Sequence, residues 1–134
     1  AGQVLVLYGA ATGLSASRSE AWSQSSPGVP GGSETNDAFG SALAAGKLSS
    51  DNCDDLAIGT PGEDLSNPPF NSVNSGAVTA LLGSTSGLTS TGASFFPDSS
   101  DSGDDGIDQF DGVGSALAIG SVLQLGNSFD ELVT

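Results

Sequence analysis

The chain has 134 residues, and its 16 acidic residues stand against only two basic ones, so its formal net charge is −14. This charge argues against nucleic acids and anionic membrane surfaces as partners, because both attract clustered Lys and Arg side chains, and the apolar runs are far too short for membrane insertion. The absence of His and the single Cys exclude Ser-His-Asp and Cys-His nucleophile systems, His-ligated zinc and an internal disulfide.

The composition predicts an all-β chain. Twenty glycines and many serines separate short apolar runs, while charged residues, which include the helix formers Lys, Glu and Arg, make up only 13%. The Ser and Gly content and the acidity would also suit a disordered chain. The 37% hydrophobic content is gathered into discrete runs, which favours folded strands over disorder.

An internal repeat organises the sequence. Gly2–Gly9 returns 74 residues later as Gly76–Gly83, and Asp37–Gly46 returns at the same offset as Asp111–Gly120. Repeats of this length indicate like structural units that bury their apolar faces against one another.

Each unit is predicted to hold four short strands. The first strands in the chain, Gly2–Gly9 and the segment around Trp22, match the third and fourth strands of a unit. A complete set follows, with the strands Phe39–Lys47, Asp55–Thr60, Gly76–Gly83 and Ala93–Pro97. The last two, Val113–Gly120 and Asp130–Thr134, match a first and a second strand. Tandem four-stranded units are typical of β-propeller blades, and this chain holds about two blades' worth.

This pattern divides the chain into three parts. Residues 1–36 are the end of a first blade, with its third and fourth strands and the following loop. Residues 37–110 are one complete blade with its following loop, and residues 111–134 are the start of a further blade. Because partial blades expose unpaired strand edges, we expect the chain to be a segment of a longer propeller, whose partners are further blades of the same or neighbouring chains.

Small and large residues predict how the blades are oriented. The alanines of Phe39–Lys47 predict a strand crowded between neighbours, and we expect this strand and Val113–Gly120 to lie nearest the propeller axis. Trp22 and Phe96 share the repeat offset and are expected in the outermost strands. We expect these two rings to pack between blades, and carbohydrate stacking is the alternative.

Two segments of the complete unit resemble a known family. Asp37-Ala38-Phe39-Gly40 and Asp54–Asp64, which contains Gly59-Thr60-Pro61, are similar to the FG and GAP motifs of FG-GAP repeats in bacterial proteins that resemble integrin α-subunit β-propellers. The resemblance covers almost the whole chain, although Val113 stands where the second copy should have Phe. It implies four-stranded antiparallel propeller blades.

The resemblance also implies a function. It favours a non-catalytic, secreted or cell-surface module for adhesion, for binding a protein or glycan ligand, or for structural assembly. The alternative is an accessory propeller of a secreted hydrolase or polysaccharide lyase, or a propeller lectin. Glycoside hydrolysis needs paired carboxylates of which one has a raised pKa, and every acidic residue here lies in polar, turn-rich sequence. We therefore predict that the chain is not an enzyme.

The family further implies a calcium loop between the first two strands, which falls on Lys47, Ser49, Asp51, the Cys53 carbonyl and Asp55. Hard cations need several oxygen ligands on one tight turn, and Lys47 supplies none. Either calcium is retained weakly by Ser49, Asp51, Cys53 and Asp55, or the Lys47 ammonium replaces the ion and pairs with Asp51 or Asp55. The second is the preferred expectation, so calcium is predicted to be absent or weak.

The remaining candidate features are expected to have structural roles. The acidic loop Asp98–Asp111 could capture a divalent cation, but a solvated rim loop is the preferred interpretation. The matching stretch for calcium in the second copy, Ser121–Glu131, has few carboxylates and is not expected to bind the ion. Asp37 and Asp111 are expected to cap turns, and the Cys53 side chain is expected to point inward.

Overall fold

The computed structural model describes residues 1–67, 70–72, 74–97, 112–120 and 131–133, and every regular element in these ranges is a β-strand. The strands are β1 (Val4–Ala10), β2 (Gly13–Trp22), β3 (Leu43–Gly46), β4 (Asp55–Thr60), β5 (Leu65–Asn67), β6 (Phe70–Ser72), β7 (Ala77–Ser84), β8 (Gly87–Pro97), β9 (Ala118–Gly120) and β10 (Glu131–Val133). All of their pairings are antiparallel. A search of these ranges finds no helix that could span a membrane. The predicted all-β class is confirmed.

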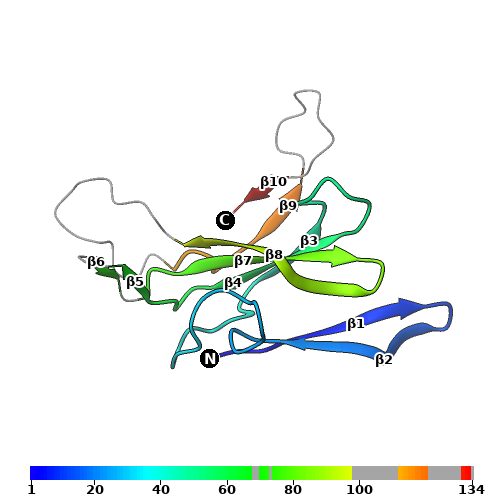
Figure 1. Cartoon of the computed structure of the whole chain (residues 1–134), viewed down its shortest axis with the longest axis horizontal. Coiled ribbons are helices and arrows are strands. Elements are labelled where there is room, and N and C mark those ends of the chain that lie inside the picture. Colours follow the sequence, from blue (N-terminus) through cyan, green and yellow to red (C-terminus); the bar gives the residue numbers. More distant parts are fainter. Residues whose placement is uncertain (68–69, 73, 98–111, 121–130, 134) are drawn as a thin grey trace.

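The centre of the molecule is one four-stranded antiparallel sheet with the strand order β3–β4–β7–β8. This is the predicted complete blade, with its four strands side by side in chain order (Figure 1). β4 has the predicted bounds. It ends where Thr60-Pro61-Gly62 turns the chain: the Glu63 N–H donates to the Thr60 carbonyl at 3.2 Å. Proline also removes a ladder donor, so the strand stops there.

The first and fourth strands of this sheet differ from their predicted lengths. β3 begins only at Leu43, because the Ser41 N–H donates to the Ala38 carbonyl at 2.9 Å and makes a turn of the residues around Gly40. β8 begins at Gly87, well before the predicted Ala93, because β7 and β8 form a hairpin across Thr85 and Ser86. Sequence periodicity shows where apolar residues lie, but a hairpin also carries polar residues into the ladder.

The two central strands are buried on both faces. One face of β4 and β7 carries Ile58 and Leu81, both 0% exposed, and these pack with Val4, Val29 and Phe39 in a single apolar cluster. Val4 belongs to the β1–β2 sheet, so this core lies between that sheet and the blade. This shared core agrees with the interpretation of the repeats as units that bury their apolar faces against one another.

Along β3 the predicted crowding is not seen. Leu43 is 48% exposed, Ala45 is exposed, and Ala44 is only partly buried. The reason is that β3 is an edge strand of its sheet, with β4 on one side. Its nearest neighbour in the second unit is β9, the matching first strand (Figure 1).

The units contact each other through glycine at matching positions. A side chain at Gly2 would collide with the main chain of Phe39, and one at Gly76 would collide with the main chain of Val113, and both pairs are separated by 37 residues. The second contact includes a parallel bridge between Gly76 and Val113, and the Val113 N–H donates to the Ser75 carbonyl at 3.1 Å. Close backbone approach at equivalent positions is what stacked repeats require.

One strand pair was not predicted. β5 and β6 form a short antiparallel hairpin inside the segment Pro61–Ser75, which the sequence indicated only as a long loop.

The division of the chain at residues 36 and 110 remains a prediction.

The turn before β3 stores backbone strain that can be tested. Ala38 has a φ of 58°, and Gly112, at the matching position of the second unit, has a φ of 62°. An L-residue in this left-handed region destabilises the folded state by roughly 1–2 kcal/mol, and Gly avoids this cost. Glycine also makes the unfolded chain more flexible, which offsets about half of that gain. We therefore expect Ala38→Gly to raise the free energy of unfolding by about 0.5–1 kcal/mol. Urea unfolding measures this, with Gly112→Ala as the converse variant; a less stable Ala38→Gly protein would contradict the assignment of strain.

Candidate functional site

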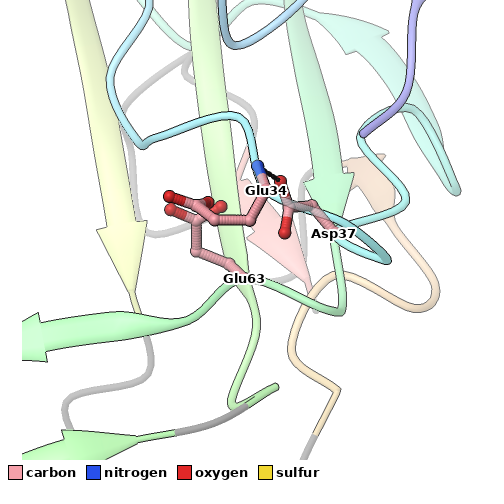
Figure 2. A group of neighbouring side chains, drawn as sticks. All are labelled: Glu34, Asp37 and Glu63. Carbon is pink, nitrogen blue, oxygen red and sulfur yellow. Dashed lines mark hydrogen bonds between the residues drawn. The ribbon is translucent and has the colours of Figure 1, made fainter.

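Three carboxylates from two separate segments meet beside the blade. Glu34 and Asp37 lie on the loop between β2 and β3, and Glu63 follows β4 (Figure 2). One oxygen from each carboxylate lies within 4.8 Å of the others. Asp37 is 1% exposed and Glu63 is 2% exposed, whereas Glu34 is exposed. We call these three residues the acidic cluster.

The loop places Asp37 by local hydrogen bonds. Its Oδ2 accepts the Glu34 N–H, which caps the turn as predicted, and its carbonyl accepts the Gly62 N–H at 2.9 Å. Asn36 and Ala38 on either side have positive φ values of 76° and 58°. The chain therefore turns sharply on both sides of Asp37 and directs its side chain inward, where Oδ1 has no hydrogen-bond partner among the residues that the structure describes.

Glu63 is held by a second segment of the same loop. The Gln24 amide nitrogen donates to Glu63 Oε2, and Gln24 is itself 6% exposed. Burial raises the pKa of Glu63 to about 7. The charges of Asp37 and Glu34 raise this pKa further. The hydrogen bonds from the Gln24 amide and the Gly32 N–H lower it, but by less than burial raises it. Burial also raises the pKa of Glu34, with the neighbouring Asp37 and Asp64 charges as further causes.

The raised pKa of Glu63 corrects the prediction that no carboxyl here would be perturbed. Its local sequence, Pro61-Gly62-Glu63-Asp64, is polar, but the tertiary fold buries it against a distant loop. A general acid needs contact with its substrate, and a side chain that is 2% exposed has none. The perturbed pKa is therefore no evidence for glycoside hydrolysis.

The Glu63 pKa gives a stability prediction with a definite sign. The folded protein holds this proton up to a pH of about 7, while an unfolded Glu releases it near its ordinary pKa of 4.5. Folding stability therefore falls as pH rises between these values, by up to about 2–3 kcal/mol. In buffer with EDTA, which removes divalent cations, the Glu63→Gln variant should be more stable than the unmodified chain at pH 8 and equally stable at pH 4. Thermal melts across this range measure the difference, and a difference independent of pH would contradict it.

The predicted calcium loop is organised by hydrogen bonds of its own. The Leu48 and Ser49 N–H groups donate to Asp55 Oδ2 at 2.8 and 2.6 Å, and the Gly83 N–H donates to Asp55 Oδ1 at 2.8 Å. Asp51 Oδ1 accepts the Cys53 N–H at 2.8 Å. Both Asp55 oxygens thus serve main-chain donors, so Ser49, Asp51, Cys53 and Asp55 fit a calcium ion poorly. That calcium is absent or weakly bound at this loop remains a prediction.

The prediction that Lys47 pairs with Asp51 or Asp55 was wrong. Its Nζ lies 3.7 Å from Asp54 Oδ1, and neither Asp51 nor Asp55 is within salt-bridge distance. Asp55 is 1% exposed and saturated by main-chain N–H groups, whereas the Asp54 side chain is 71% exposed and free to meet a long lysine. Such an exposed pair contributes little to stability.

The other predicted sites have mixed outcomes. Trp22 packs against the apolar cluster, as expected, while Phe96 at the matching register is 50% exposed. Cys53 is only partly buried. The acidic loop Asp98–Asp111 and residues 121–130 of the second copy's loop lie outside the described residues.

Sequence reasoning found Asp37 but missed Gln24, Glu34 and Glu63 as its neighbours. Glu34 and Asp37 are three residues apart, and Glu63 is the last residue but one of the GAP segment. No signal in one sequence connects these two segments, because the loop between β2 and β3 reaches Glu63 only through tertiary packing.

Comparison with known proteins agrees with this architecture. A family model described as FG-GAP repeat matches residues 39–81, which begin at the buried Phe39, cover β3 and β4 and end in β7. No curated protein and no solved structure shows significant similarity to the chain. Residues 39–81 are therefore similar to an FG-GAP repeat, and the four-stranded antiparallel sheet to which they contribute is consistent with a blade of the β-propeller type.

Proposed function

We propose that this chain acts outside the cell as a non-catalytic propeller module, in the manner of integrin α-subunit propellers. It would serve in adhesion and ligand binding or in structural assembly, with other blades and a protein or glycan ligand as its partners. The observation that carries the proposal is the FG-GAP blade together with its repeated glycine contacts to the neighbouring units. Such packing builds a rigid scaffold whose loops are free for recognition.

Exposed apolar side chains support further blades as partners. Leu5 and Leu7 on β1 are 64% and 41% exposed, and Phe96 on β8 is 50% exposed. Among the described strands, β1 pairs only with β2, whereas β7, its counterpart in the complete blade, pairs on both edges. An unpaired edge with apolar neighbours favours association with another strand.

The chemistry of the described residues supports a binding role over catalysis. The chain has no His, and the one carboxyl with a strongly raised pKa, among the residues the structure describes, is buried. A rigid binding module with exposed loops needs neither a His nor an exposed carboxyl with a raised pKa. The net charge of −14 favours ligands with a neutral or basic surface.

The experiment is a binding screen with a turnover assay. The labelled chain is applied to arrays of extracellular proteins and glycans, and each bound ligand is recovered and analysed by mass spectrometry. We expect saturable binding, with the ligand recovered unchanged. A cleaved or otherwise altered ligand would overturn the non-catalytic role, and ligands confined to glycans would assign a lectin in its place. An antibody against the chain, applied to intact source cells and their medium, tests the location; signal only after lysis would contradict an extracellular role.

A further inference from the structure

The acidic cluster lacks a neutralising side chain. The chain has only two cationic side chains, and both are placed elsewhere. Arg18 lies over the Tyr8 ring at 5.3 Å and donates to the Ser86 carbonyl at 2.9 Å, while Lys47 pairs with Asp54. The terminal ammonium of Ala1 donates to the main-chain oxygen of the exposed Glu34.

The buried carboxylates of Asp37 and Glu63 therefore have no cationic side chain beside them. Burial of charge without such compensation is costly in a protein interior. A bound cation would supply the missing charge.

Gln24 gives an independent indication that the acidic cluster binds a ligand. It is 6% exposed, its amide nitrogen contacts Glu63, and its Oε1 is buried without a hydrogen-bond partner. Asp37 Oδ1 is also buried and has no hydrogen-bond partner among the described residues. Buried polar atoms in proteins nearly always have a partner. Asp37 and the Gln24 side chain that contacts Glu63 thus each have a buried acceptor oxygen that a cation could use.

The spacing of the oxygens suits calcium. Calcium–oxygen distances are about 2.3–2.6 Å, so ligands on opposite sides of one ion lie about 4.6–5.2 Å apart. The three carboxylate oxygens lie within 4.8 Å of one another and could reach a single ion with little movement. Magnesium demands strict octahedral geometry and usually keeps several water ligands, so a site made mainly of protein oxygens suits it less well.

We propose that Glu34, Asp37 and Glu63, with the Gln24 amide oxygen, form a calcium-binding site. Figure 2 shows that these carboxylates come from the loop between β2 and β3 and from the turn that follows β4, and the ion would tie these two segments together. The site is separate from the loop at residues 47–55, whose carboxylate Asp55 already serves three main-chain donors.

The loop fits closely over this site. A methyl group at Gly31 would lie 2.8 Å from Glu63 Oε1 and 3.0 Å from Gln24 Nε2, and its φ of +88° also favours glycine. Gly31 thus lets the main chain approach the carboxylate, and the ion would hold that approach in place.

The test is calcium titration of the chain by calorimetry and thermal melting, in EDTA-treated buffer at pH 8. We expect one saturable site and a rise in Tm of several degrees at about 1 mM CaCl2. Glu63→Gln and Glu34→Gln should each weaken binding by about tenfold or more, since each removes a carboxylate ligand. Glu63→Gln keeps an oxygen for the Gln24 hydrogen bond and removes a buried charge, so it should melt higher without calcium and lose the calcium shift.

Two control variants change the same charge elsewhere. Asp54→Asn removes an exposed carboxylate and should keep the full calcium shift. Asp51→Asn alters the loop at residues 47–55 and should keep it as well. A shift that survives Glu63→Gln but disappears in Asp51→Asn would overturn the proposal. So would an unmodified chain without calcium binding, or an equal shift with NaCl at matched ionic strength.

Discussion

Replacing Asp55 with Asn is expected to lower the free energy of unfolding by about 3–5 kcal/mol. The Asp55 carboxylate is 1% exposed and accepts N–H groups from Leu48, Ser49 and Gly83. Hydrogen bonds to a buried charged group are worth roughly twice those between neutral groups. Asn keeps the shape of the side chain but turns an NH2 group toward at least one main-chain donor. The loop before β4 and the end of β7 would both lose their anchor.

Urea unfolding followed by circular dichroism measures this loss. The matched control is Asp54→Asn, because Asp54 is the adjacent residue and its side chain is 71% exposed. We expect the control to change stability by no more than about 0.5 kcal/mol. Equal stability of the two variants would show that the three main-chain hydrogen bonds do not hold this loop.

Replacing Gly59 with Ala should cost about 4 kcal/mol or prevent folding, because the added methyl group meets main chain of the second unit. A Cβ at Gly59 would collide with the Gly114 carbonyl oxygen and lie 2.8 Å from its carbonyl carbon. Main-chain atoms cannot move aside as a side chain can, so the two units must separate. Gly59 lies in β4, the most buried strand of the blade, and its φ is not positive, so packing alone determines the effect.

The control for this variant is Gly9→Ala. Gly9 also lies in a strand, β1, and a Cβ there would meet nothing within 4 Å. We expect it to change stability by about 0.5 kcal/mol or less, because only the backbone entropy of the unfolded chain changes. Comparable losses in both variants, measured by thermal and urea unfolding, would contradict a close backbone contact between the units.

The repeat predicted the blade well because strands depend on local patterns. The alternation of apolar runs with Gly and Pro turns gave β4 its bounds and β7 nearly so. β3 was predicted too long because the FG segment makes a turn, in which Gly40 has a φ of 90° and Ala38 a φ of 58°. Backbone conformations of this kind are set by packing against the neighbouring unit and leave little trace in composition.

The candidate site was predicted less completely than the fold. Asp37 was expected to cap a turn, but Gln24 and Glu63 are 39 residues apart and meet only in the folded chain. The pKa of Glu63 depends on this meeting, so its polar local sequence was misleading. The partner of Lys47 was missed for a similar reason, because burial made Asp55 inaccessible and left Asp54 exposed.

Nuclear Overhauser effects between main-chain protons test the central claim, that an FG-GAP blade packs through glycine against the next unit. The account predicts cross-strand effects along β4 and β7, including the pair Gly59 and Val78. It also predicts effects between Gly76 and Val113, which belong to successive units and form a parallel bridge. Effects within the sheet but none between Gly76 and Val113 would contradict the packing of the units, and their absence between β4 and β7 would contradict the blade itself.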